Sequence, residues 1–187
     1  MAVPTPAEAE LLLASYDLPD GIVAHSRGVS LVAAEAARLL EAAGVAVDPH
    51  LVAVAALLHD VDKLVTRADG GQHGVVAAQR MAERGFPELA EPIASHPIAC
   101  LLDPSRAPRG WAAVAVAVAD RHVAQDFVTI DERIDDQARR YPAFRAGLEA
   151  ARAPAHAMQA DLAAAARISV DQLEARLRAA WDEGHAG

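Results

Sequence analysis

An uninterrupted apolar run that ends in two titratable residues constrains this chain more than any other feature. Leu51–Leu58 contains no polar side chain, and His59 and Asp60 follow it directly. The run predicts a buried segment, where an isolated charge is strongly unfavourable. His59 and Asp60 therefore need partners close by, and an imidazole beside a carboxylate is a good pair of ligands for a divalent metal.

The rest of the chain has the features of a succession of helices. Alanine is abundant, aromatic residues make up only 4% of the sequence, and β-branched runs are few, a composition that favours helices. Capping boxes are expected at Thr5 and Thr129, Ser169 is expected to cap the last helix, and Gly44 is placed to end the second helix. We therefore predict an all-α bundle that forms a single domain over residues 1–187, a length too short for two ordinary domains.

Two segments are less clear from their residue pattern. Thr66–Gln72 is polar and contains glycine, which predicts a loop, with the next helix beginning at His73. In Trp111–Asp120 valine alternates with alanine, which fits a strand as well as a helix. Both faces of this segment are apolar and its neighbours are helical, so we predict a buried helix. Asp120 then closes a second apolar segment and also needs a partner.

Charge and hydropathy limit the partners that this chain can have. Its formal net charge of −9 argues against a nucleic-acid duplex or an anionic membrane as the main partner. No apolar stretch reaches the roughly 20 residues that span a bilayer. Without a signal-peptide pattern, and with Cys100 as the single cysteine, we expect a cytoplasmic protein. A small anionic substrate remains compatible because a bound metal reverses the local field. An oligomer also remains compatible with the sequence.

Other candidate metal ligands lie at the ends of predicted elements. The chain has eight histidines, and a single histidine near the edge of a core is more often structural than a ligand. His50, His156 and His185 occupy loop-like or terminal positions, where we expect them to be solvated. The residues that combine with the pair at the end of the apolar run are His25, His73, His96 and Asp120.

The order of these residues resembles the HD-domain metal-dependent phosphohydrolase superfamily. His25-Ser26-Arg27-Gly28-Val29 is similar to the family's first-histidine helix, Leu57-Leu58-His59-Asp60-Val61-Asp62-Lys63 to its signature, and Val116-Ala117-Val118-Ala119-Asp120 to the helix that carries its last aspartate. The resemblance covers about residues 20–140 and implies a metal-binding core there. The C-terminal helices, about 143–182, would pack on this core.

His73 and His96 are similar in position to the two extra histidines of the dinuclear branch of this superfamily. That likeness implies two divalent or trivalent transition-metal ions. It assigns one ion to His25, His59, Asp60 and Asp120. It assigns the other to Asp60, His73 and His96, so that Asp60 bridges the two. Ligands of this kind suit Fe or Mn first, with Zn, Ni or Co as alternatives.

The resemblance implies hydrolysis of a phosphoester or phosphoanhydride in a small, nucleotide-like substrate by a metal-bridging hydroxide. The nearest likeness is to bacterial HD-domain hydrolases that split diadenosine tetraphosphate symmetrically. Arg121–Asp126 departs from the acidic, proline-containing run of that group. The chain also lacks the Gly-Tyr-Pro motif carried by one kind of cyclic-di-GMP phosphodiesterase, so we do not expect that activity. Two alternatives stay open: a dinuclear-iron oxygenase of the HD type, and a non-catalytic module that binds a metal or a nucleotide.

Three basic residues are candidates for contacts with the substrate. Lys63 lies one helical turn beyond Asp60, where it could neutralise a phosphate and act with Asp60 in catalysis, although a solvated lysine at a helix end is an equal alternative. Arg106 and Arg109 flank prolines in the loop before Trp111. Guanidinium groups suit phosphate oxygens, but loop arginines are more often merely solvated.

Two further residues have weaker assignments. Asp62 could order Lys63 or a metal-bound water. His122 could assist protonation of a leaving group, but an exposed histidine beyond the helix end is the simpler interpretation.

Overall fold

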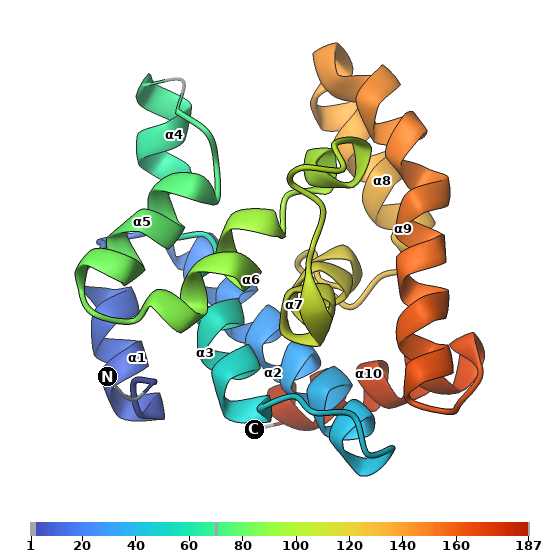
Figure 1. Ribbon diagram of the computed structural model, residues 1–187. Helices are drawn as coiled ribbons and strands as arrows, with labels where there is room; N and C mark the ends of the chain where they lie inside the picture. Colours follow the sequence, from blue (N-terminus) through green and yellow to red (C-terminus); the bar gives the residue numbers. More distant parts are fainter. Residues whose placement is uncertain (1–2, 70, 187) are drawn as a thin grey trace.

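The computed structural model describes residues 3–69 and 71–186, and this part of the chain contains helices and no β-strand (Figure 1). The predicted all-α class is confirmed. Three short 3-10 turns, η1 (Pro87–Leu89), η2 (Ile98–Leu102) and η3 (Pro142–Phe144), lie between the α-helices. The α-helices are α1 (Pro6–Ala14), α2 (Asp20–Ala42), α3 (Pro49–Leu58), α4 (Lys63–Asp69), α5 (Val75–Glu83), α6 (Ala90–Ser95), α7 (Gly110–His122), α8 (Ile130–Arg140), α9 (Arg145–Ala165) and α10 (Val170–His185).

Local capping sets several helix boundaries where the sequence predicts them. The side chains of Thr5, Thr129 and Ser169 each accept a hydrogen bond from the backbone N–H three residues later. The glutamate or glutamine at that later position in turn accepts a hydrogen bond from the backbone N–H of the capping residue. Each box satisfies two backbone donors that the helix leaves unpaired. Gly44 follows α2 with a φ of 88°, a conformation that glycine adopts at little cost.

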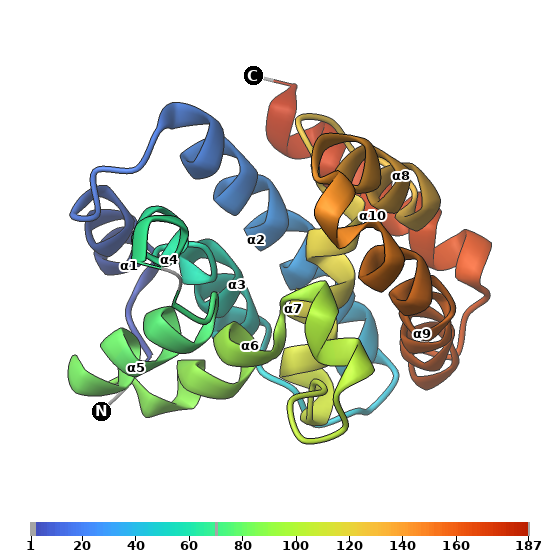
Figure 2. The same cartoon turned by 90° about the horizontal axis from the view of Figure 1, so that it is seen from above.

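Helices α2, α3 and α7 pack against one another at the centre of the molecule (Figures 1 and 2). Val32 of α2, Leu58 of α3 and Val116 of α7 are completely buried. Because both faces of α7 are covered, by α2 and α3 on one side and by α9 on another, its Val-Ala alternation is compatible with a helix. The prediction of a buried helix over this segment is confirmed.

The C-terminal helices pack on this centre through close contacts with small residues. Helix α10 contacts α2 and α9, and α8 contacts α9. A Cβ atom added at Gly28 would overlap the indole of Trp181, so glycine at this position lets α10 approach α2 closely. Ile130, Ile134 and Leu148 form a separate buried cluster between α8 and α9.

The segment after His59 and Asp60 differs from the prediction of a loop over Thr66–Gln72. Helix α4 covers Lys63–Asp69, and the buried Thr66 is compatible with it because its hydroxyl donates to the carbonyl of Asp62, four residues earlier, at 3.0 Å. Gly70 lies outside the described residues. Helix α5 begins at Val75 rather than His73, since Gly74, with a φ of 84°, precedes it.

Within the described ranges, no helix combines the length and the apolar character needed to cross a membrane.

Candidate metal centre

Six side chains that the sequence singles out meet near the centre of the molecule. They come from five parts of the chain: α2, the end of α3 with the turn after it, the residue before Gly74, the end of α6, and α7. Two groups of buried ligand-type atoms lie close together and share His59: one is His25, His59 and Asp120, and the other is His59, Asp60 and His96. The six residues are His25, His59, Asp60, His73, His96 and Asp120.

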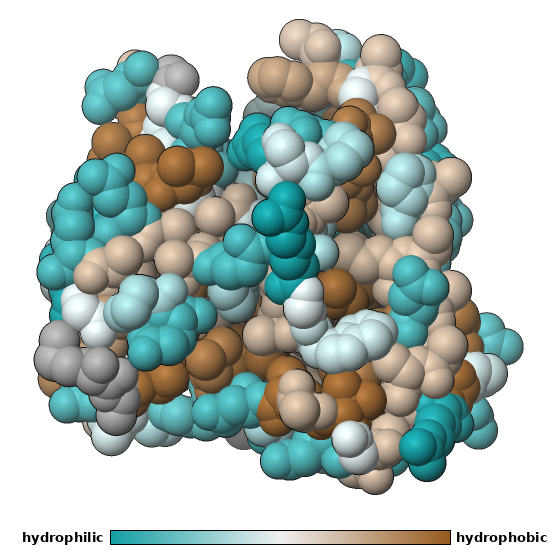
Figure 3. Space-filling model, viewed as in Figure 1, coloured by the Kyte–Doolittle hydropathy of each residue, from teal (hydrophilic) through white to brown (hydrophobic). Residues whose placement is uncertain are grey.

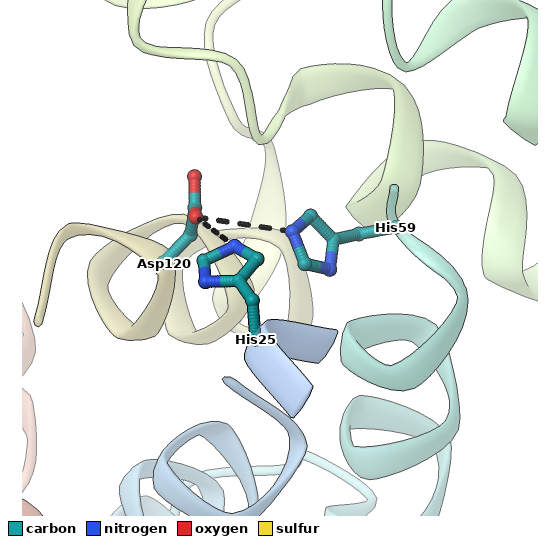
Figure 4. Close-up of side chains that lie close together, drawn as sticks. All are labelled: His25, His59 and Asp120. Carbon is teal, nitrogen blue, oxygen red and sulfur yellow. Dashed lines mark ion pairs between the residues drawn. The ribbon is translucent and has the colours of Figure 1, made fainter. Parts of the chain in front are cut away.

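His25, His59 and Asp120 form one side of this cluster (Figure 4). Oδ1 of Asp120 lies 3.1 Å from Nε2 of His25 and 3.8 Å from Nε2 of His59. The two imidazole centroids are 5.3 Å apart, and all three residues are buried. Two nitrogens and one oxygen therefore face a common point.

Asp60 lies between that side and the other two histidines. Its Oδ2 is 3.7 Å from Nε2 of His25, whereas its Oδ1 is 3.0 Å from Nε2 of His73 and 3.9 Å from Nε2 of His96. Oδ1 also lies 3.6 Å from Nε2 of His59. This one carboxylate therefore lies within 4 Å of all four histidines of the cluster, with Oδ2 toward His25 and Oδ1 toward the other three.

His59 and His96 are oriented by the same local arrangement. Each occupies the position that ends a helix, and each donates from Nδ1 to the carbonyl three residues earlier, Ala56 or Ile93, at 2.6 Å. Carbonyls in the last turn of a helix lack an intrahelical donor, so the ring satisfies one of them. With the proton on Nδ1, Nε2 presents its lone pair to the cluster.

His73 is oriented by a side chain instead. Its Nδ1 donates to Oδ1 of Asp62 at 2.7 Å, while Oδ2 of Asp62 accepts the backbone N–H groups of Gly74 at 2.8 Å and Ala77 at 3.0 Å. Asp62 is completely buried. Both of its oxygens thus hold the segment that carries His73, and a role for Asp62 in ordering Lys63 or a metal-bound water stays a prediction.

Several buried polar atoms of the cluster have no hydrogen-bond partner among the described residues. They include Nε2 of His25, Nε2 of His59 and Oδ1 of Asp60. The first and third lie 3.1 Å from Oδ1 of Asp120 and 3.0 Å from Nε2 of His73, but not in hydrogen-bond geometry. An unpaired buried polar atom costs about 1–3 kcal/mol, and three such atoms aimed at one region are unusual in a structural core. A set of imidazoles and carboxylates with these free positions fits transition-metal ions.

The pKa shifts agree with that fit. Burial lowers the pKa of His59 and holds that of His96 well below the usual value, so both rings are neutral, as metal ligands must be. Burial would raise the pKa of Asp60, but His59, Lys63 and their neighbours outweigh it and hold that pKa well below the usual range. Asp120 behaves likewise, with Arg121 as the largest opposing influence on its pKa.

His73 differs from the other histidines of the cluster in its charge. Burial lowers its pKa, but the carboxylates of Asp60 and Asp62 outweigh burial and raise the pKa to about 9. Without a metal this ring is therefore protonated at neutral pH. A metal bound at Nε2 would displace that proton.

Basic side chains surround the two carboxylates. Lys63 forms an ion pair with Asp60, and Arg121 pairs with Asp120 while donating to the His96 carbonyl at 3.1 Å. Sequence reasoning misses Arg121 and also Arg133, whose guanidinium lies 3.7 Å from Oδ1 of Asp120.

A cavity of about 130 Å³ opens beside His25, and Lys63 lines it. Arg106 and Arg109 are not among its lining residues. The backbone N–H of Arg109 donates to Glu91 at 3.1 Å, and its guanidinium donates to the Ser105 carbonyl at 3.3 Å. A role for these two arginines in substrate binding stays a prediction.

His122 is neither exposed nor free. It lies inside α7 with no exposed surface. Its Nδ1 donates to the Val128 carbonyl at 2.9 Å, and Gln159 donates from its side-chain amide to Nε2 at 3.1 Å. The prediction of an exposed residue is wrong, and with both nitrogens engaged the ring is not available to protonate a leaving group.

Comparisons with known proteins match the part of the chain that builds this centre. A protein-family model described as HD domain matches residues 22–125, more than half of the chain and all six clustered residues. An uncharacterized protein of Methanocaldococcus jannaschii is 38% identical over 79 residues, which is 42% of this chain and 46% of that protein. The match therefore spans less than half of the relative's length. No solved structure matches the chain.

Proposed function

The chain belongs to the HD domain family, and we propose that it is a metal-dependent phosphohydrolase acting on a phosphoester or phosphoanhydride of a nucleotide-like substrate. The observation that carries this proposal is the set of buried, unpaired ligand atoms on His25, His59 and Asp60. A fold that binds no metal has no evident need for such costly atoms facing one another, and a metal held there would supply the hydrolytic chemistry.

Six residues would hold two metal ions in this proposal. His25, His59, Asp60 and Asp120 would bind one, and Asp60, His73 and His96 the other. The position of the Asp60 carboxylate, within 4 Å of all four histidines of the cluster, supports its role as the shared ligand. Two such ions, with Fe or Mn as the first candidates, would activate water and stabilise negative charge on the phosphoryl oxygens.

The residues around the ligands would bind and orient the substrate. Lys63 is partly exposed at the edge of the cluster and already pairs with Asp60, so its ammonium group is placed to neutralise a phosphate oxygen. Arg121 positions Asp120 and the segment of His96 through its two contacts. Arg106 and Arg109 remain candidate ligands for a more distant part of the substrate.

A phosphate-release screen tests this function. The protein would be loaded with Mn, Fe, Co or Ni under anaerobic conditions and assayed with nucleotides and dinucleotides, diadenosine tetraphosphate among them. We expect metal-dependent release of phosphate or nucleotide, its loss in Asp60→Ala, and its retention in the control His156→Ala, which changes an exposed histidine outside the cluster.

Three results would contradict the proposal. The first is metal content below about one ion per chain after reconstitution, since binding at this centre should load the folded protein. The second is oxygen consumption with no anaerobic phosphate release, which would favour a dinuclear-iron oxygenase. The third is tight nucleotide binding without turnover under any metal, which would favour a binding module.

A further inference from the structure

Four basic residues surround the small cavity that opens on the cluster. Lys63 and Arg67 come from α4, whereas Arg133 and Arg140 come from α8. His25 lines the same cavity, so the basic residues lie directly beside the proposed metal ligands. Such a concentration of positive charge is unexpected at random in a chain with a formal net charge of −9, and it indicates an anionic ligand.

Two of these four cations lie beside carboxylates of the cluster, and the other two do not. Lys63 pairs with Asp60, and Arg133 lies near Asp120. Arg140 has only Asp136, which it shares with Arg139. Among the residues that the structure describes, Arg67 forms no ion pair. The surplus positive charge therefore belongs to Arg67 and Arg140, on opposite sides of the cavity.

Arg133 adds a second, independent observation. Its side chain is only 10% exposed, and its Nε has no hydrogen-bond partner within the described chain. The nearest carboxylate oxygen, on Asp120, is 3.7 Å from the guanidinium, which exceeds hydrogen-bond distance. A buried guanidinium whose Nε–H has no partner in the described chain calls for an acceptor from elsewhere.

The arrangement of the helices leaves room for such an acceptor. Arg133 and Arg140 are seven residues apart, two turns along the same face of α8. Helices α4 and α8 stand on opposite sides of the molecule's upper part in Figure 1, and the space-filling view is hollowed between these sides (Figure 3). The cavity volume of about 130 Å³, against about 30 Å³ for one water in the liquid, admits a small polar group such as a phosphate.

We propose that Arg67, Arg133 and Arg140 bind a second phosphate of the substrate, adjacent to the phosphorus that is attacked at the cluster. This inference rests on the proposed function and names its substrate class: nucleoside di- or polyphosphates, or dinucleoside polyphosphates, in preference to monophosphates. Guanidinium groups suit this role because they donate two parallel hydrogen bonds to phosphate oxygens.

Binding of two matched analogues tests the proposal without relying on turnover. Isothermal titration would compare adenosine monophosphate with α,β-methylene adenosine diphosphate, which resists hydrolysis between its two phosphorus atoms. We expect the wild-type protein to bind the diphosphate analogue at least about tenfold more tightly, the effect of one charge-assisted hydrogen bond. The metal content of every sample would be measured, so that all variants are compared at equal loading.

Arg139 provides a matched control for Arg140. Both residues are exposed, both pair with Asp136, and only Arg140 lines the cavity. Arg140→Ala and Arg67→Ala should each lower the affinity for the diphosphate analogue about five- to tenfold and reduce the preference over the monophosphate. Arg139→Ala should preserve both the affinity and the preference.

Specific outcomes would overturn the proposal. They are equal wild-type affinity for the two analogues, no binding of the diphosphate analogue, or equal losses in Arg140→Ala and Arg139→Ala, which would indicate a general effect of charge. Failure of the proposed function is distinguishable, because it would appear as absent phosphate release in the screen while the diphosphate preference and its dependence on Arg140 persist.

Discussion

The histidines of the cluster are held in two different ways. His59 and His96 are buried, and each is oriented by a backbone carbonyl of the helix that it ends. The side chain of His73 is 31% exposed and is oriented by the carboxylate of Asp62. The first arrangement follows from helix geometry alone, whereas the second depends on one residue that a substitution can remove.

This difference suggests that the cluster has a rigid part and a part that is easier to alter. A carbonyl in the last helical turn stays in place as long as the helix is intact. Asp62 holds His73 only while the segment through Gly74 and Ala77 also bonds to it. We therefore expect the metal position that includes His73 to be the more sensitive of the two to changes outside its ligands.

The largest effect is expected where the two sides share a ligand. Asp60→Asn should remove both ions and lower turnover by at least about a thousandfold, because several kcal/mol of transition-state stabilisation are lost. Metal analysis and the phosphate-release assay measure the two effects. Asp161→Asn, an exposed change on α9, is the control. A variant at position 60 that keeps two ions would show that this carboxylate is not the bridge.

A smaller and one-sided effect is expected at Asp62. Asparagine has one acceptor oxygen, so it cannot both accept from His73 and accept the backbone N–H groups of α5. Asp62→Asn should lower metal affinity at the His73 position about 10- to 100-fold and leave one ion per chain at limiting metal. Anaerobic metal titration checks this result, with Asp69→Asn, at the end of the following helix α4, as the control. Equal affinity for two ions in Asp62→Asn would mean that carbonyl-held and carboxylate-held histidines do not differ.

Gly74 connects the two ways of holding a histidine. Its N–H bonds to Asp62, and a Cβ at this position would lie 2.9 Å from the Ile93 carbonyl oxygen, the acceptor that orients His96. Gly74→Ala should lower the free energy of unfolding by about 2–4 kcal/mol through contact and backbone strain and weaken metal binding beside His73.

Gly110 separates the contribution of strain from that of contact. Its φ of 77° is similar, but a Cβ there would meet no described atom within 4 Å. Gly110→Ala should therefore cost about 1 kcal/mol and leave metal affinity unchanged. Urea unfolding together with metal titration measures both quantities. Equal losses of metal affinity in the two variants would show that the Ile93 carbonyl is not what matters.

The sequence was sufficient for those features that depend on local patterns. The capping residues Thr5, Thr129 and Ser169 form hydrogen bonds within one helical turn, and the apolar run before His59 indicates a buried segment. Both features can be identified from neighbouring residues alone, without knowing which other segments they contact. The order of the ligands along the chain gave the family. The helical state of Trp111–Asp120 required one further fact, that its neighbours are helices.

Contacts between distant segments could not be predicted in the same way. Asp62 contacts His73, eleven residues later in the sequence, and the spacing of apolar and polar residues along the chain does not predict such a contact. Arg133 did carry a signal, since it lies between Ile130 and Ile134 at positions that form the buried face of α8. That signal identifies a buried guanidinium but not its neighbour Asp120, which another helix supplies.

The smallest effect on metal binding is expected at a histidine that is as buried as His59. His122 and His59 both have no exposed surface, but both nitrogens of His122 have protein partners, whereas Nε2 of His59 has none among the described residues. If an unpaired ring nitrogen marks a ligand, His122→Ala should keep full metal content and lower the free energy of unfolding by about 2–4 kcal/mol. The loss comes from a cavity and from the hydrogen bonds that the ring makes with Gln159 and the Val128 carbonyl. His59→Ala should lose metal yet cost the metal-free protein less, because it also removes an unpaired buried nitrogen. Metal analysis of both variants, and urea unfolding of both in the presence of a chelator, test these expectations. An equal loss of metal in His122→Ala and His59→Ala would show that burial, and not an unpaired ring nitrogen, distinguishes the residues that the centre needs.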